Sequence, residues 1–183
     1  MRPNVRRDGG LTRRMGLSIM LICLAQGVAA QPVFQSPQLF SSTGASTDAT
    51  SLIAVADVGS FDGPTDGIPD LITAAQNQRA VVLYGRSNGT FVSGRPTVNL
   101  GSIPMALTVA DMNADGLGDL LIADTTDAIT VLRGDNSSLS QPPFVAEGTP
   151  VAVGRNPVAI EVADIDLDGH LDAVVVNEGD QSQ

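Results

Sequence analysis

The sequence contains no lysine and no tryptophan, and only one histidine and one cysteine among its 183 residues. A nucleophilic triad, a Schiff-base lysine or a reactive thiolate would each need residues that this composition nearly lacks. Ten arginines stand against 20 acids, which gives a formal net charge of −10. A basic patch for nucleic acid and a cationic surface for anionic membranes are therefore both excluded. We expect no enzyme active site in this chain.

The first thirty residues have the composition of an export signal. Residues 1–16 carry five arginines, and residues 17–30 (LSIMLICLAQGVAA) form an apolar run that ends in a small-x-small motif at Val28 and Ala30. This run is shorter than the about 20 residues that span a bilayer. The pattern predicts a signal peptide over residues 1–30, and TRRMGL partly resembles a twin-arginine signal. We therefore expect a secreted or periplasmic protein without a membrane span.

The predicted mature chain, residues 31–183, contains no cysteine and thus no disulfide, and it keeps five arginines against 19 acids, a formal net charge of −14. Eleven of these acids fall in three short clusters, so the charge is concentrated rather than spread over a solvated surface. Residues 31–48 are rich in Ser, Thr, Gln and Pro. They predict either a flexible lead-in or one outer strand of the domain that follows.

From residue 49 onward the chain repeats itself with a period near fifty. VADMNADGLGDLLIAD (109–124) and VADIDLDGHLDAVVVN (162–177) align at an offset of 53 residues, and a third copy with a longer loop, VADVGSFDGPTDGIPDLITA, occupies 55–74. Each copy has a Val/Ile/Leu-rich segment on either side of an acidic loop. Such short segments, bounded by Gly, Asn, Pro and Ser, are typical of strands and turns.

The repeats predict the fold class. The first two units contain a third strand (AVVLYG, AITVLRG) and a weaker fourth segment around TFVSGRP and PFVAEG, and no segment shows a sustained helical period. Four antiparallel strands in about 50 residues are the size of a β-propeller blade. We expect an all-β fold with two full blades, about 49–100 and 101–153, and a truncated third blade over 154–183, in an incomplete ring.

The acidic loop of the second unit has the ligand spacing of a calcium loop. Acceptors at positions 1, 3 and 5, glycine at 6 and a carbonyl at 7 match the start of an EF-hand loop, although here an Asp follows at position 9 and strands flank the loop. Two carboxylates about 4 Å apart repel by roughly 4 kcal/mol at an effective dielectric near 20, and a divalent cation removes that repulsion. An all-oxygen ligand set favours Ca²⁺. The residues are Asp111, Asn113, Asp115, Gly116, Leu117 (carbonyl) and Asp119.

The third unit repeats this set and the first unit varies it. The first loop is about five residues longer, and the sequence leaves open whether its site is intact, distorted or empty. We expect one Ca²⁺ per loop, two or three in total; the alternative for each loop is a solvated turn that uses Asp and Gly for their backbone preferences. The candidate ligands are Asp164, Asp166, Asp168, the carbonyl of His170 and Asp172 in the third unit, and Asp57, Asp62, Asp66 and Asp70 in the first.

The motif D-x-[DN]-x-D-G-x-x-D after a V-A-D strand, together with VVLYGRSNGTF (81–91), resembles the FG-GAP and VCBS repeat family over about residues 50–183. The resemblance implies calcium-binding blades of a β-propeller like the integrin α-subunit head, usually of about seven blades. It also implies a secreted or surface protein that adheres or binds ligands, or an accessory part of an enzyme. We expect a non-catalytic module that presents loops to an extracellular protein or glycan ligand.

Two and a half blades do not close a ring, and an open stack leaves sheet edges and apolar faces unpartnered. We expect further blades, either from a longer chain or from other copies of this one. The alternative functions are an accessory propeller of a larger secreted enzyme and a self-assembling surface protein. Arg133-Gly134-Asp135 spells an integrin-binding tripeptide, but its place after a predicted strand indicates a strand-to-turn junction.

Overall fold

The structure, a computed structural model, describes residues 18–21, 24–25, 33–34, 38–41, 50–59, 65–93, 95–138 and 140–179. The chain divides into two compact units, residues 1–47 and 48–183. In the first unit, β1 (Ser18–Leu21) pairs with β4 (Gln38–Ser41), and β2 (Leu24–Ala25) pairs with β3 (Val33–Phe34). The predicted signal peptide thus contains β1 and β2, and the predicted lead-in contains β3 and β4.

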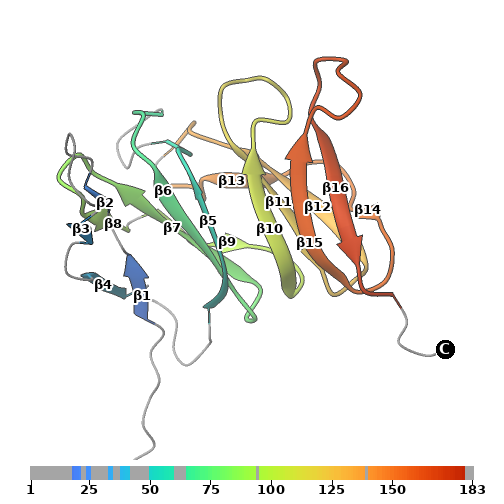
Figure 1. The fold of residues 1–183 in the computed structure, drawn as a ribbon, viewed down its shortest axis with the longest axis horizontal. Helices are drawn as coiled ribbons and strands as arrows, with labels where there is room; N and C mark the ends of the chain where they lie inside the picture. Colours follow the sequence, from blue (N-terminus) through green and yellow to red (C-terminus); the bar gives the residue numbers. More distant parts are fainter. Residues whose placement is uncertain are drawn as a thin grey trace, which may run out of the picture. The chain divides into compact units, whose positions relative to one another are not determined.

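The second unit consists of three antiparallel sheets that follow one another along the chain (Figure 1). Blade 1 has the strand order β5 (Thr50–Ala56), β6 (Asp70–Ala75), β7 (Arg79–Gly85) and β8 (Phe91–Val92), and β9 (Val98–Asn99) also pairs with β7. Blade 2 repeats this order with β10 (Pro104–Ala110), β11 (Asp119–Asp124), β12 (Ala128–Gly134) and β13 (Phe144–Ala146), and β14 (Val151–Ala152) pairs with β12. Blade 3 has β15 (Pro157–Ala163) and β16 (Asp172–Asn177).

The all-β prediction of two full blades and part of a third is confirmed. Every regular element among the described residues is a strand, and the sheets form an open series of propeller-type blades. No helix in the described part of the chain is long and apolar enough to cross a membrane.

The fourth strand of each full blade is split, which the sequence did not predict. β8 pairs with the end of β7 at Tyr84 and Gly85, whereas β9 pairs with its start at Arg79 and Ala80. The break between the two segments contains Pro96 in blade 1, and the matching break in blade 2 contains Pro150. Proline has no N–H to donate to a neighbouring strand, so the pairing is interrupted there.

The first strands of the three blades have the same irregularity. The register between strand one and strand two shifts between Thr50 and Leu52, between Pro104 and Ala106, and between Pro157 and Ala159. A bulge at one equivalent position in all three blades bends strand one in the same way each time. The blades are therefore copies in backbone geometry as well as in sequence.

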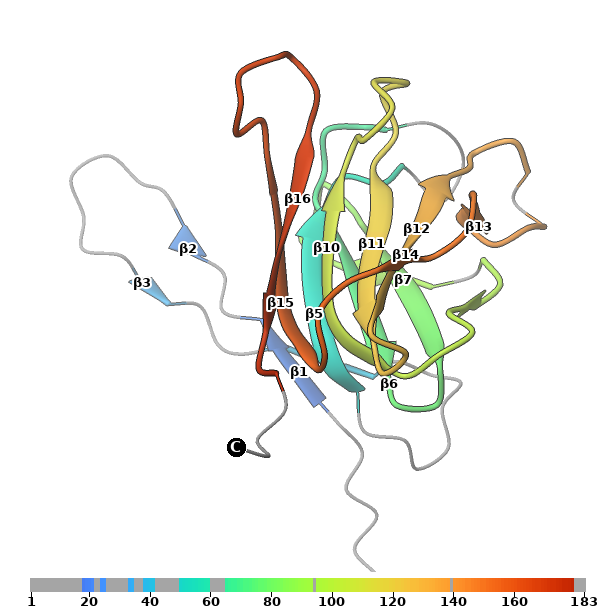
Figure 2. The ribbon, with the colours of Figure 1, turned by 90° about the vertical axis from the view of Figure 1, so that its right-hand side faces the viewer.

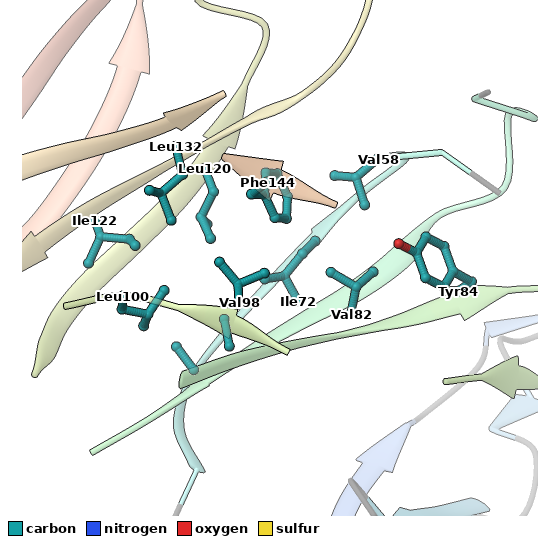
Figure 3. Packing of buried hydrophobic residues seen from close by; sticks show 12 residues of the cluster. Val58, Ile72, Val82, Tyr84, Val98, Leu100, Leu120, Ile122, Leu132 and Phe144 are labelled. Carbon is teal, nitrogen blue, oxygen red and sulfur yellow. The ribbon is translucent and has the colours of Figure 1, made fainter. Parts of the chain in front are cut away.

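Apolar side chains form a core between each pair of successive blades, whose first strands β5, β10 and β15 lie side by side (Figures 1 and 2). Between blades 1 and 2, Ile72 and Val82 face Leu120, and Val98 lies beside them (Figure 3). A second cluster between blades 2 and 3 contains Leu121 and Ile160. β11 is buried on both faces, which explains why its sequence is a continuous apolar run rather than an alternating one.

Candidate metal sites

The three acidic loops connect strand one to strand two of each blade and lie at the same edge of the blade series (Figure 1). They follow β5, β10 and β15, whose last residues are Ala56, Ala110 and Ala163. Because the blades are copies, residues far apart in the sequence supply equivalent carboxylates along this edge.

The loops of blades 2 and 3 share one hydrogen-bond pattern, which begins at the first Asp. The Asp111 carboxylate accepts hydrogen bonds from the N–H groups of Asp115 at 3.0 Å and Gly116 at 2.8 Å. The Asp164 carboxylate accepts the equivalent bonds from Asp168 at 3.1 Å and Gly169 at 3.0 Å. The first Asp therefore holds the turn closed in both loops.

The acceptors at positions 3 and 5 continue the pattern. Asn113 Oδ1 and Asp166 Oδ1 accept the N–H of position 5 at 2.9 and 3.2 Å. Oδ1 of the Asp at position 5 accepts the N–H of position 7, that of Leu117 or His170, at 2.8 Å in each loop. These bonds fix the side chains at positions 3 and 5 against the backbone of the loop in the same way in both blades.

The turn needs left-handed backbone at two positions, of which the sequence indicated one. Gly116 and Gly169, the glycines at position 6, have φ values of 85° and 90°, which glycine adopts without steric cost. At position 4, Ala114 and Leu167 also have positive φ values, 58° and 61°. Residues with a Cβ adopt this region rarely, so neither Ala nor Leu signals it in the sequence.

The first loop keeps the same framework despite its extra length. Asp57 Oδ2 accepts the N–H of Gly67 at 2.7 Å, and Asp66 Oδ1 accepts that of Ile68 at 2.9 Å. These contacts are equivalent to those made by positions 1 and 5 in the other loops. Asp57 and Asp66 therefore correspond to positions 1 and 5 of the other loops, whereas Asp62, predicted for position 3, lies outside the described residues.

The Asp at position 9 has a structural role that the sequence analysis did not assign. Asp119 is 2% exposed; its Oδ2 accepts the N–H of Met112 at 2.9 Å and its Oδ1 accepts that of Gly134 at 2.8 Å. Asp70, 1% exposed, accepts the equivalent bonds from Val58 at 2.9 Å and Gly85 at 2.8 Å. This carboxylate ties the loop to the end of strand three.

The pKa of Asp70 is raised to about 6, mainly because the carboxyl is buried and to a smaller extent because the carboxylates of Asp57 and Asp66 lie nearby. The hydrogen bonds from Gly85 and Val58 lower it, because they favour the charged form. The negative charges of this loop thus oppose one another, which a cation in the loop would relieve.

Gly85 and Gly134 are site residues that the sequence reasoning missed. A Cβ on Gly134 would lie 2.7 Å from the carbonyl oxygen of Gly118, and a Cβ on Gly85 would overlap the carbonyl oxygen of Pro69. Only glycine therefore brings this N–H to the carboxylate. The signal was present as a glycine 15 residues after the position-9 Asp in both full blades.

The same contact explains the Arg-Gly-Asp tripeptide. Gly134 is the last residue of β12, so the tripeptide lies at the predicted junction of strand and turn. A glycine is needed there because a Cβ would collide with the backbone of the acidic loop. Arg133 Nε lies 3.5 Å from Glu147 Oε2, and Asp135 Oδ1 accepts the N–H of Ser137 at 2.7 Å. Arg133, Gly134 and Asp135 thus each make a contact within blade 2.

The carboxylates of the third loop fit a cation in their spacing. Oxygen atoms of Asp164, Asp166 and Asp172 all lie within 4.8 Å of one another. Oxygens that each lie about 2.3–2.6 Å from one Ca²⁺ are separated by at most about 5 Å, so these three are close enough to share an ion. Asp166 is exposed and the other two are partly buried, so the group is open to solvent. Asp168 Oδ1 accepts the hydrogen bond from the N–H of His170 described above, and the His170 residue is exposed.

The fold and the repeated loops define a β-propeller-type repeat protein. The sequence matches the model of the FG-GAP-like repeat family over residues 61–122 and 111–175, which together span more than half of the chain. The chain therefore belongs to the FG-GAP-like repeat family. No curated protein and no solved structure matched the chain.

Proposed function

We propose that this chain is a secreted, non-catalytic calcium-binding module of a β-propeller, which presents its loops for adhesion or for binding a protein or glycan ligand. The observation that carries the calcium part is the convergence of Asp164, Asp166 and Asp172 in a loop whose hydrogen bonds repeat in blade 2. Members of the FG-GAP-like repeat family, to which the chain belongs, typically lack catalytic sites.

The residues present suit a hard divalent cation because every candidate ligand offers oxygen. When bound, Ca²⁺ would supply the positive charge that offsets the repulsion among the loop carboxylates. In blade 2 the ion would be held by Asp111, Asn113, Asp115, the Leu117 carbonyl and Asp119. In blade 3 the equivalent set is Asp164, Asp166, Asp168, the His170 carbonyl and Asp172. In blade 1 the set would be Asp57, Asp62, Asp66 and Asp70.

The loop hydrogen bonds prepare these ligands for the ion. The N–H groups of positions 5, 6 and 7 fix the rotamers of the acidic side chains, so that little side-chain freedom is lost on binding. Position 9 is anchored to strand three in blades 1 and 2, so a ligand at that position would couple the ion to the whole blade.

Export and ligand presentation rest on other parts of the chain. The arginine-rich segment and apolar run of residues 1–30 support secretion or transfer to the periplasm. The shared edge of the three blades supports presentation, because it places three loops next to one another on one side of the module (Figure 1). A partner that binds this edge would contact the calcium-stabilised loops rather than enter a pocket.

Two variants at one position test the calcium proposal sharply. Asn113 occupies in blade 2 the place that Asp166 occupies in blade 3. We therefore expect Asp166→Asn to keep the ion with weaker affinity, and Asp166→Ala to lose one bound Ca²⁺ per chain. Isothermal titration of the full chain gives the number of ions, and thermal unfolding with Ca²⁺ or with chelator gives the stabilisation.

Glu161 provides the matched control, because it is an exposed acid of the same blade outside the loop. Glu161→Ala should bind as many ions as the parent. The proposal fails if the parent chain melts at the same temperature with Ca²⁺ and with chelator, or if Asp166→Ala and Glu161→Ala lose the same amount of binding.

A further inference from the structure

The turn between strand three and strand four differs in length between the two full blades. In blade 1, residues 86–90 connect β7 to β8, and in blade 2 the longer segment 135–143 connects β12 to β13. The shorter turn closes on itself: the Arg86 N–H donates to the Thr90 carbonyl at 2.9 Å, and the Gly89 N–H donates to the Arg86 carbonyl at 2.8 Å. Because each additional ordered residue costs conformational entropy, the longer turn needs additional contacts.

Those contacts come from Arg95 of blade 1, which lies in the break of strand four between β8 and β9. Its Nη2 donates to the carbonyl oxygens of Asp135 at 2.9 Å and Ser138 at 2.8 Å. Its Nη1 donates to Asn136 Oδ1 at 3.0 Å, and its Nε donates to the Gln141 carbonyl oxygen at 3.4 Å. The planar guanidinium presents five N–H donors in a fixed arrangement, which suits it to several acceptors at once. One side chain of blade 1 thus contacts four residues of the turn of blade 2.

Blade 1 meets this turn through other groups as well. The Asn136 amide packs against Gly59 of blade 1, where a Cβ would lie 2.7 Å from Asn136 Nδ2. Arg95 itself lies near the buried Tyr84 of β7: burial raises the pKa of the Tyr84 hydroxyl, and the positive charge of Arg95 lowers it. Arg95 is therefore placed between a buried strand of blade 1 and the turn of blade 2.

Blade 2 has threonine at the position of Arg95. The segments Gly94-Arg95-Pro96 and Gly148-Thr149-Pro150 align on their glycine and their proline, which places Thr149 where Arg95 stands in blade 1. Threonine has a short side chain with one hydroxyl donor, so it cannot bind four acceptors of a neighbouring blade. The contact made by Arg95 is thus an addition to the first pair of blades rather than a feature of every repeat.

We infer that Arg95 is a strap between blades 1 and 2, which makes the folded turn 135–143 of blade 2 depend on strand four of blade 1. The turn begins at the edge that contains the acidic loops, because Gly134 packs against the Gly118 carbonyl of the second loop. A displacement of strand four in blade 1 therefore reaches the loop edge of blade 2 through a polar contact as well as through the apolar core. The strap needs no metal ion, so it stands apart from the calcium proposal.

Hydrogen exchange of the full chain tests the strap. Two amides report on the turn: the Asp135 N–H donates to the Pro143 carbonyl at 2.8 Å, and the Gln141 N–H donates to the Ser138 carbonyl at 3.2 Å. In Arg95→Met both amides should exchange at least about tenfold faster than in the parent, because the charge-assisted hydrogen bonds that hold the turn are lost. The Gly89 amide should exchange as in the parent, since the turn of blade 1 closes on itself.

Two milder variants separate the hydrogen bonds from the charge. Arg95→Lys keeps the positive charge, but one ammonium group cannot bind four separate acceptors, so both amides should still exchange faster than in the parent. Asn136→Ala removes one acceptor and leaves the three carbonyls, so it should accelerate exchange by a smaller factor than Arg95→Met. If Arg95→Met loses its circular dichroism spectrum, these two variants carry the test.

Arg79→Met is the matched control, because it removes an exposed arginine of blade 1 with the same change in charge. Its exchange at Asp135 and Gln141 should equal that of the parent. The inference is overturned if these amides exchange at the parent rate in a folded Arg95→Met or Arg95→Lys chain. It is also overturned if Arg79→Met accelerates them as much as Arg95→Met does.

Discussion

Blades 2 and 3 contain nearly the same loop on different supports. In blade 2 the position-9 carboxylate of Asp119 is buried and bonded to Met112 and to Gly134 at the end of strand three. In blade 3 the equivalent Asp172 is partly exposed and accepts the N–H of Ile165 at 3.0 Å, and the described part of this blade contains two strands. The turn itself is the same in both blades. The loop conformation is thus set within its own nine residues, and strand three decides only how firmly the loop is attached.

The two loops also differ in charge. Blade 2 has Asn113 at position 3, whereas blade 3 has Asp166 there, so the third loop carries one more carboxylate. Asn113 Nδ2 donates to Asp115 Oδ2 at 3.0 Å, a stabilising contact that a carboxylate cannot make. The third loop should therefore depend more strongly on a bound cation than the second.

The largest effect should follow from removing the support of the second loop. In Gly134→Ala the new Cβ would lie 2.7 Å from the Gly118 carbonyl oxygen, so the strand and loop must separate. We expect a loss of about 3 kcal/mol in the free energy of unfolding, measured by denaturant titration. Gly148→Ala, where no atom lies near but φ is 70°, should cost only about 1 kcal/mol. Equal losses in the two variants would contradict a packing role for Gly134.

We expect an effect of intermediate size when the two position-9 carboxylates, Asp119 and Asp172, are replaced and the losses in free energy of unfolding are compared. Asp119→Asn replaces one of two buried acceptors by an amide group, which leaves a backbone N–H without its partner and should cost about 2 kcal/mol. Asp172→Asn affects a partly exposed side chain and should cost less than about 1 kcal/mol. Both values come from unfolding in chelator, so that loss of Ca²⁺ does not contribute. A larger loss for Asp172→Asn would mean that strand three does not support the loop.

The smallest effect concerns the loops in the absence of Ca²⁺. One additional carboxylate about 4 Å from another costs about 1 kcal/mol in water, which corresponds to about fivefold in an equilibrium constant. We therefore expect the Gly169 amide of the third loop to exchange its hydrogen about fivefold faster than the Gly116 amide of the second loop in chelator. Asp166→Asn should bring the two rates together, as measured by hydrogen exchange. Unchanged rates in that variant would rule out charge as the cause.

The blades and loops could be predicted from the sequence because their signals are local. Apolar strands on either side of an Asp-rich turn with glycine at position 6 repeat at a readable spacing, and the hydrogen bonds of Asp111 and Asp164 span only four or five residues. The role of Gly134 was missed because its partner Asp119 lies 15 residues away and meets it only when strand three returns along strand two. The left-handed backbone of Leu167 was missed because its side chain gives no sign of it.

Asp70 and Gly85 lie in the same repeat, as do Asp119 and Gly134. In each full blade the hydrogen bond that ties the loop to strand three is therefore made within one repeat. The repeats are spaced by 54 and 53 residues, measured from Asp57 to Asp111 and from Asp111 to Asp164. A gene segment of this length therefore encodes an acidic loop together with the glycine that anchors it. Duplication or loss of one such segment changes the number of blades without breaking a loop in those that remain, which makes this architecture one that can lengthen or shorten by whole units during evolution.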